Sequence, residues 1–364
     1  MRSPKILYCA SSDSHLLRFH LPYIKALSEK HTVILLGNGA RSDYALPFSK
    51  RFFSFSNLRV FWRMKKILRK ENLDAILAHT CMASFLLRLA LKGQKRRPPV
   101  LVTVHGYLFS KAPKGIRGHI LLFCERLVRD QTDAIAVMNQ EDLEIAQRYK
   151  LSNGPIFFLS GMGLPEPPLS IRPIDIRKRY AISKKELLLG YVGELSERKN
   201  QIFLIRAIAK LREEGVPAHL VLLGDGAKRE ALEREARRIG IAPHVILLGE
   251  RQDASAFLRS LDLYVSASRA EGLPFNLMEA MDAGLPILAS SVKGQTDLLL
   301  EKEDSLYVPE SMDAFCQKVK EIWDRKQLGA GSIFYPNLSR YRLSEVFFEN
   351  MRIFEGWKTK WQDF

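Results

Sequence analysis

Short apolar runs and longer amphipathic stretches alternate along the whole chain. In the first half, apolar runs at 6–10, 32–36, 74–78, 100–104, 133–138 and 155–159 predict buried strands. In the second half, such runs lie at 187–192, 218–223, 245–248, 261–267 and 285–289. Stretches at 20–28, 59–70, 125–131 and 199–212 have helical character. This alternation predicts an α/β protein with two Rossmann-like, doubly wound parallel sheets.

A segment rich in Pro and Gly at 161–168 separates the two series of strands and is typical of an interdomain hinge. The length of 364 residues also favours two domains of ordinary size. We therefore expect domains at residues 1–165 and 166–340. The aromatic-rich end of the chain, 341–364, predicts a terminal helix that includes 343–361.

The segment 261–289 predicts a strand, a loop, a helix and a second strand. The helix is expected to start near Phe275 and to end at Gly284, with Pro286 reinforcing the stop. The loop would lie at the carboxyl end of a parallel strand, where open α/β sheets bind ligands, and a helix N-terminus suits a phosphate. Glu271 and Glu279, with seven residues between them, could accept hydrogen bonds from sugar hydroxyls. On spacing alone, two glutamates without a role are the simpler interpretation; the surrounding strand, Gly and Pro pattern favours a site.

The segment 271–279 resembles the E-x7-E signature of the retaining glycosyltransferases of family 4. Further resemblances to that family lie at 193–200, 222–226 and 247–251, and those at 19–23 and 103–113 are to members from bacterial exopolysaccharide, capsule and O-antigen clusters. The resemblance implies the GT-B fold, in which two Rossmann-like domains face a cleft. It also implies that the amino-terminal domain binds the acceptor, that the second domain binds the nucleotide sugar, and that the last helix packs back on the first domain.

The resemblance implies a cationic site for the donor pyrophosphate. Lys199, with Arg198, would neutralise the charge that develops on the leaving nucleoside diphosphate, which is electrostatic catalysis. The family usually has an arginine directly after the glycine that matches Gly193, but Glu194 stands here. Arg198 is the candidate substitute, although a solvated residue at a helix start is an equally good interpretation.

The remaining implied roles concern the sugar, the ribose and the base. Glu271, His105 and Lys199 would form the catalytic group, with His105 contacting the donor sugar. The other donor-binding positions would be Arg251 beside the base, through its backbone, Phe275 and Asn276 through backbone N–H groups, Glu279 on the ribose, and Gly294 as a point of close approach. His79 and His105 both follow predicted strands, which favours a place at one edge of the sheet.

The sequence gives no sign of a metal or cofactor. It contains no Asp-x-Asp motif, which metal-dependent glycosyltransferases use to hold a divalent ion. Its four Cys residues lack metal-site or disulfide spacing and fit a reducing cytoplasm. We expect a metal-independent enzyme whose nucleotide sugar is a substrate. We expect no membrane-spanning helix, because no apolar run approaches roughly 18 residues.

The positive charge is concentrated in the first half of the chain. Residues 1–170 hold 26 Lys and Arg against 12 Asp and Glu, and the rest holds 30 against 28. An anionic membrane surface, nucleic acid or simple solubility could explain this excess. The basic amphipathic stretch 59–70 and the basic loop 92–99 are candidates for membrane contact, although a packed surface helix and a solvated turn explain them too.

We therefore expect a retaining enzyme that moves a hexosyl or N-acetylhexosaminyl group, from a UDP-sugar by preference, to a lipid-linked or oligosaccharide acceptor in surface-polysaccharide assembly. It would be cytoplasmic and bound peripherally to the inner face of the membrane. A sugar-nucleotide epimerase of the same fold is an alternative, but no arrangement of acids and His for proton abstraction is visible. A nucleic-acid binder is a second alternative, for which no known motif is present.

Overall fold

The computed structural model describes residues 3–49, 54–167, 170–300, 302–327 and 335–357. The chain divides into two units. The amino-terminal unit comprises Met1–Gly163 with Arg340–Phe364, and the carboxyl-terminal unit comprises Leu164–Ser339. No helix in the described part of the chain combines the length and apolar character that crossing a membrane requires.

The amino-terminal unit contains a seven-stranded sheet in which every neighbouring pair is parallel. Its strands are β1 Lys5–Cys9, β2 Thr32–Gly37, β3 Tyr44–Ala45, β4 Ala75–His79, β5 Val100–Val104, β6 Ala134–Val137 and β7 Ile156–Phe158, in the order β3-β2-β1-β4-β5-β6-β7. The central strands β4, β5 and β6 are buried along their whole length. Continuous apolar runs predict such strands because helices cover both faces of a parallel sheet.

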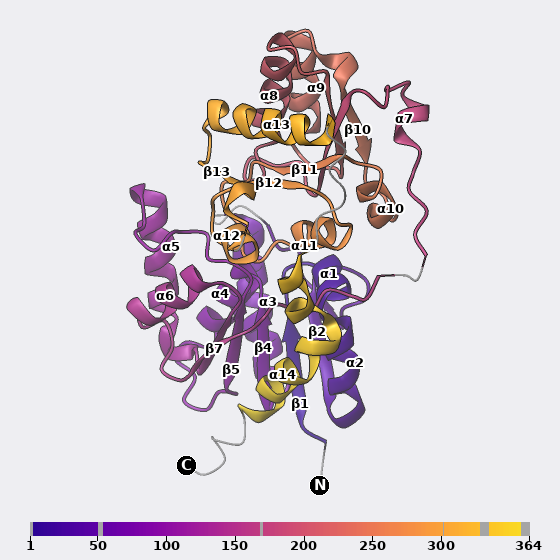
Figure 1. The fold of residues 1–364 in the computed structure, drawn as a ribbon. Coiled ribbons are helices and arrows are strands. Elements are labelled where there is room, and N and C mark those ends of the chain that lie inside the picture. The colour runs from indigo at the N-terminus through magenta and orange to yellow at the C-terminus, as the bar shows by residue number, and fades with distance from the viewer. Residues whose placement is uncertain (1–2, 50–53, 168–169, 301, 328–334, 358–364) are drawn as a thin grey trace. The chain divides into compact units, whose positions relative to one another are not determined.

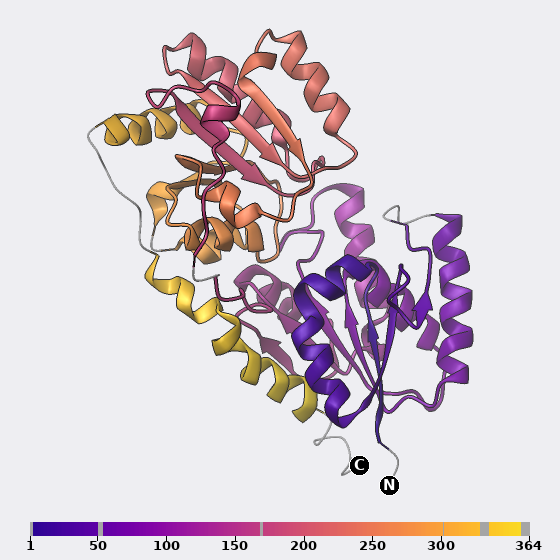
Figure 2. The same cartoon turned by 90° about the vertical axis from the view of Figure 1, so that its right-hand side faces the viewer.

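The helices of this unit are α1 Asp13–His15, α2 Leu21–Lys30, α3 Phe55–Lys70, α4 Cys81–Leu91, α5 Gly115–Leu127, α6 Gln140–Arg148 and α14 Leu343–Gly356. Figure 2 shows α2 and α14 on one face of the sheet and α3 on the other. The helix predicted at 125–131 was misplaced, since α5 ends at Leu127 and a 3-10 turn follows. The sequence pattern did not reveal the first part of α5, because Gly115 and Gly118 interrupt its helical periodicity. Gly118 is explained by packing, because a Cβ there would lie 3.2 Å from Pro113.

The helix α14 returns to the amino-terminal unit and packs against α2. The fully buried Asn350 donates from Nδ2 to Tyr23 Oη at 2.9 Å and to the Gly161 carbonyl at 2.8 Å. Tyr23 Oη in turn donates to the Met162 carbonyl at 3.1 Å. These bonds join α14 and α2 to the segment 161–162, where the chain leaves the amino-terminal unit. Residues 358–364, into which the predicted helix extended, lie outside the described residues.

The carboxyl-terminal unit repeats the design with six parallel strands. They are β8 Leu187–Val192, β9 Ala218–Leu223, β10 Val245–Gly249, β11 Leu263–Ser266, β12 Ile287–Ser290 and β13 Leu306–Tyr307, in the order β10-β9-β8-β11-β12-β13. The helices are α7 Ile176–Arg179, α8 Gln201–Glu213, α9 Arg229–Arg238, α10 Ala254–Leu258, α11 Phe275–Asp282, α12 Gln295–Leu299 and α13 Met312–Gln327.

Each sheet reverses its strand order at one place. In the first sheet this place lies between β1 and β4 (Figure 1), and in the second it lies between β8 and β11. Loops leave such a switch point in opposite directions and open a crevice at the carboxyl ends of the strands, where ligands bind. The prediction of an α/β protein with two doubly wound sheets is confirmed. The parallel pairing of β11 with β12 confirms the strand–loop–helix–strand prediction.

Candidate active site

The loops after β8 and β11 flank the switch point of the carboxyl-terminal unit. The first runs from Gly193 to Asn200 and leads into α8, and the second contains Glu271 and leads into α11. The helix α11 begins at Phe275 and its following Gly284 has φ +68°, as the sequence predicts. The Asn276 side chain donates from Nδ2 to the Val192 carbonyl at 2.6 Å. That bond ties the start of α11 to the end of β8, a role that sequence reasoning missed.

Glycines allow the loops of this site to touch through their backbones. A Cβ at Gly294, where φ is +76°, would lie 2.0 Å from the Gly272 carbonyl oxygen. A Cβ at Gly224 would lie 2.1 Å from the Gly193 carbonyl oxygen. Any side chain at these positions would push the loops apart. Gly294 therefore permits a close approach, and the neighbour it approaches is the backbone next to Glu271.

The centre of the site is a buried carboxylate held by two cations. Glu271 is 6% exposed, and Lys199 is 8% exposed. Lys199 Nζ donates to Glu271 Oε1 at 2.5 Å, and Arg198 Nη1 donates to Oε2 at 2.7 Å. Arg198 Nη1 also donates to the Ala270 carbonyl at 2.7 Å. The structure thus brings together three of the residues that the sequence singled out.

Burial and charge act in opposite directions on this cluster. Burial alone would raise the pKa of Glu271, but Lys199 and then Arg198 outweigh it and lower that pKa. Burial lowers the pKa of Lys199, and Glu271 only partly offsets this. For Arg198, Glu271 outweighs burial and raises the pKa. A carboxylate with two cations therefore carries one net positive charge, which suits an anionic ligand.

The other predicted donor-site residues lie around this cluster. Glu279 is half-buried on α11, about one turn after the helix start, and Phe275 is half-buried at its first position. Arg251 follows β10 and donates from Nε to Asp253 Oδ1 at 2.7 Å and from Nη2 to Oδ2 at 2.5 Å. Its side chain is thereby engaged within the protein. The backbone of Arg251 is left for the predicted contact with the base. Glu194 is exposed, and its carbonyl accepts from Gln201 Nε2 at 2.8 Å.

His105 belongs to the amino-terminal unit and lies in a cluster of four histidines. His79 ends β4, His105 follows β5, and His15 and His20 lie in the segment after β1. His15 Nε2 lies 3.2 Å from His20 Nε2, and His20 Nδ1 lies 2.8 Å from Tyr8 Oη. The sequence singled out His79 and His105 at strand ends. It missed the partnership with His15 and His20, which depends on a π-helical turn.

The histidine cluster is uncharged at neutral pH. Burial lowers the pKa of His15 to about 4. Burial also lowers the pKa of His20, His79 and His105 well below the ordinary value, and the neighbouring imidazoles add to the effect. Each ring therefore has one nitrogen lone pair available.

A cavity of about 380 Å³ opens beside the carboxyl ends of β1, β4 and β5. Its wall is mostly apolar, with a few polar side chains, and the lining residues are Ser11, Ser12, Asn38, Phe48, Ser49, Cys81, Met82, Phe85, Tyr107, Leu108, Phe109, Leu121, Cys124 and Glu125. Such a lining is typical of sites for partly apolar ligands.

Two family models match the chain, one in each unit. The model for Glycosyltransferase Family 4 matches residues 23–160, and the model for Glycosyl transferases group 1 matches residues 186–325. EpsD from Bacillus subtilis, named as a glycosyltransferase, is 28% identical over 338 residues, which cover 89% of this chain and 88% of that protein.

Two further proteins resemble this chain, one in sequence and one in structure. An Escherichia coli enzyme named UDP-Gal:alpha-D-GlcNAc-diphosphoundecaprenol alpha-1,3-galactosyltransferase is 23% identical over 306 residues, covering 80% of this chain and 77% of that enzyme. The crystal structure of WaaG, a glycosyltransferase involved in lipopolysaccharide biosynthesis, superposes with a TM-score of 0.69 at 16% identity, covering 96% of this chain and all of WaaG. That likeness shows the GT-B fold.

Replacing Glu271 by Gln removes the charge that Lys199 and Arg198 share. We expect the free energy of unfolding at neutral pH to fall by about 3 kcal/mol, because Lys199 is left buried without a counter-charge. The pKa of Glu271 is lowered by folding, so its stabilising contribution is complete above the unfolded value of about 4 and is lost as pH falls through the folded value. Urea denaturation of both proteins at neutral and at acid pH measures this.

The matched control is Glu197→Gln. Glu197 is an exposed acid on the loop that carries Arg198 and Lys199, and its carboxylate pairs with Arg269 at 2.8 Å. This substitution should cost less than about 1 kcal/mol. Equal stability of the Glu271→Gln variant and the wild-type protein at neutral pH would show that the cluster contributes nothing to folding.

Proposed function

Because the chain belongs to the glycosyltransferases that join a family 4 amino-terminal half to a group 1 carboxyl-terminal half, we propose that it transfers a hexosyl or N-acetylhexosaminyl group from a UDP-sugar to a lipid-linked saccharide. The proposal includes retention of configuration at the anomeric carbon and a place in surface-polysaccharide assembly. The observation that carries it is the buried Glu271 with Lys199 and Arg198 at the switch point beside the start of α11.

The donor pyrophosphate would bind to the cations and to the N-terminus of α11. Bond cleavage at the anomeric carbon adds negative charge to the leaving diphosphate. Lys199 and Arg198 are already held in place by Glu271, so they need little reorganisation to stabilise that charge. Glu271 would also accept hydrogen bonds from sugar hydroxyls. Glu279 would bind the ribose, and the backbone at Arg251 would lie beside the base.

The acceptor would bind the amino-terminal unit. Its 380 Å³ cavity offers an apolar wall for a lipid segment and hydroxyl and amide groups for a saccharide. The E. coli relative is named for an acceptor of that kind, a saccharide on diphosphoundecaprenol. His105, at the same edge of the sheet, would contact the donor sugar.

The experiment that tests the donor class is a binding and hydrolysis screen with the purified protein. UDP-sugars should bind and be hydrolysed slowly, whereas GDP- and ADP-sugars should bind more weakly. The anomeric configuration of the released sugar, followed by NMR, tests retention. Binding of nucleic acid without affinity for any nucleotide sugar would overturn the proposal.

Replacing Lys199 by Ala should lower the rate of transfer about 100-fold, or ~3 kcal/mol in the transition state, because one preorganised cation is lost. The measurement is kcat with the best donor from the screen. Lys210→Ala is the matched control, since Lys210 is a lysine on α8 that pairs with Asp313 and Glu214 instead. A wild-type rate in the Lys199→Ala variant would remove the residue from the mechanism.

Treatment with EDTA should leave transfer largely intact. We propose that Lys199, Arg198 and the start of α11 neutralise the pyrophosphate without a divalent ion. The measurement compares initial rates before and after chelation and gel filtration. Loss of activity on chelation that Mg²⁺ or Mn²⁺ restores would contradict the metal-independent mechanism.

We further propose that the amino-terminal unit attaches to an anionic membrane, which would bring the enzyme to a lipid-linked acceptor. The helix α3 buries Val60, Met64 and Ile67 and exposes Phe55, Leu58 and Trp62 on its outer face. Exposed cations, including Arg59, Arg63, Lys66 and Arg69, flank these apolar side chains. Exposed apolar side chains among cations are typical of interfacial helices.

A second apolar surface lies on α5, where Ile116 is 82% exposed and Phe123 is 64% exposed, with Arg117 and Arg126 exposed beside them. In contrast, Arg97 of the basic loop is not available, because it donates to Asp133 from both Nη1 and Nη2. Lys95 and Arg96 of that loop remain exposed.

Replacing Arg63, Lys65, Lys66, Arg69 and Lys70 by Gln should release the protein from anionic vesicles without weakening donor binding. Each basic residue near such a surface contributes about 1 kcal/mol at most, so attachment should be reversible and salt-sensitive. The measurement is co-sedimentation at low and high salt. The matched control neutralises five exposed cations of the other unit, Arg172, Lys178, Arg179, Lys184 and Lys185. Equal pelleting with neutral and anionic vesicles, or with neither, would contradict the proposal.

A further inference from the structure

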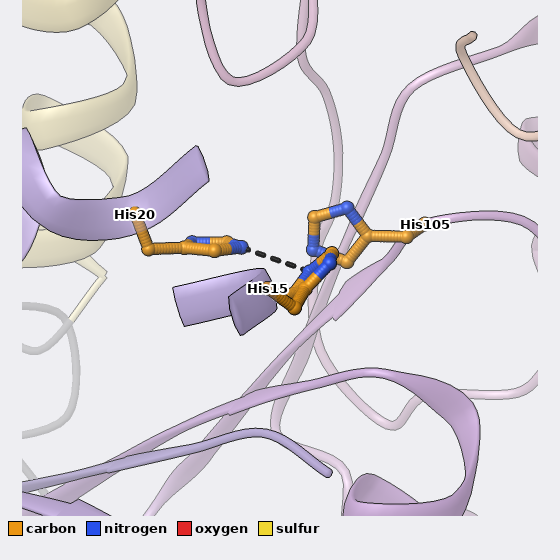
Figure 3. A group of neighbouring side chains, drawn as sticks. All are labelled: His15, His20 and His105. Atoms are coloured by element: carbon orange, nitrogen blue, oxygen red, sulfur yellow. Dashed lines mark hydrogen bonds between the residues drawn. The ribbon is translucent and has the colours of Figure 1, made fainter. Parts of the chain in front are cut away.

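Three imidazoles meet at the carboxyl edge of the amino-terminal sheet, beside its switch point. His15, His20 and His105 each bring one ring nitrogen to within 4.8 Å of the others (Figure 3). A π-helical turn, Leu16–His20, places two of them together. Because a π-helix closes its backbone bond on the fifth residue, His15 just before the turn and His20 at its end lie on one face. Single π turns occur often at functional sites.

The spacing of two of the three nitrogens matches that of ligands on one small cation. A tetrahedral zinc ion binds imidazole nitrogens at about 2.0–2.1 Å, so two ligand nitrogens lie about 3.3 Å apart. His15 Nε2 and His20 Nε2 are 3.2 Å apart. His105 offers a ring nitrogen within 4.8 Å of the other two, so a side-chain movement would bring it to the same spacing.

The surroundings also suit a bound metal. Metal-binding histidines usually have a partner for the second ring nitrogen, and Tyr8 Oη lies 2.8 Å from His20 Nδ1. His105 Nε2 is buried and makes no hydrogen bond to any of the residues that the structure describes. Such an unsatisfied buried atom is costly unless something binds it.

We propose that His15, His20 and His105 form a binding site for a borderline transition-metal cation, with Zn²⁺ as the probe. Three imidazoles without a carboxylate favour zinc, copper, nickel or iron over magnesium, calcium or manganese. Three protein ligands leave the fourth tetrahedral position open for water or another ligand. This site lies in a different unit from Lys199 and Arg198. It shares His105 with the proposed donor-sugar contact, so a bound ion and the sugar would compete for that ring, and occupancy of the site by the ion is measured without any transfer reaction.

The test uses the full chain without an affinity tag, stripped with EDTA and gel-filtered. Calorimetric titration with Zn²⁺ should give one equivalent per chain, and bound Zn²⁺ should raise the melting temperature by mass action. His15→Gln should weaken binding at least about 10- to 100-fold. His119→Gln is the matched control, because His119 is exposed on α5 and its Nδ1 contacts the Gly115 carbonyl at 2.8 Å, away from the cluster. This variant should bind as the wild-type protein does.

Two further measurements test whether three histidines bind the ion. Co²⁺ bound to the wild-type protein should show the intense visible absorption of a tetrahedral ion. This measurement needs no variant, so it is independent of whether a variant folds. Cys81→Ser should bind normally, although the half-buried Cys81 donates to the Gly106 carbonyl at the same edge of the sheet. Equal binding by His15→Gln, loss of binding in Cys81→Ser, an octahedral Co²⁺ spectrum or no saturable binding would each overturn the three-histidine site.

Discussion

The carboxyl-terminal unit depends on one interaction, the contact of the buried Glu271 with Lys199 and Arg198. Taking the charges of Glu271 and Lys199 out of water is unfavourable unless they are paired and well placed, so the loops after β8 and β11 must stay together. The glycine at 294 then allows the next loop to close on the same backbone. This arrangement holds two cations in fixed positions with one net positive charge, which is the preorganisation that an anionic leaving group requires.

The two units use the same sheet topology for different chemistry. In both, the candidate site residues follow strands at or next to the reversal of strand order, β8 and β11 in one unit and β1, β4 and β5 in the other. The carboxyl-terminal edge carries charged groups. The amino-terminal edge carries neutral imidazoles beside an apolar cavity. Parallel strands bring residues far apart in sequence to one edge, and the loops decide what each edge can bind.

The helix α3 has two different faces. The inner face of α3 packs with α4 against the sheet through Val60 and Met64, while Trp62 on the outer face is 59% exposed. Helical periodicity locates the inner face. It does not decide whether an apolar residue on the opposite face stays exposed, because that depends on which neighbouring elements cover it.

The sequence by itself determined eleven of the strands, their parallel arrangement and the choice of Lys199 and Glu271 as candidate site residues, because buried runs and loop motifs are local patterns. It missed the two-residue strands β3 and β13, which are too short to form an apolar run. It did not determine the start of α5, where Gly118 packs against Pro113, nor the bond from Asn276 to the end of β8. Only the tertiary structure decided that Arg198 reaches Glu271 and that His15 and His20 meet His105. The contact of Arg198 with Glu271 joins segments that are distant in sequence, and the meeting of His15 with His20 depends on a π turn. The spacing of residues along the chain shows neither the tertiary contact nor the π turn.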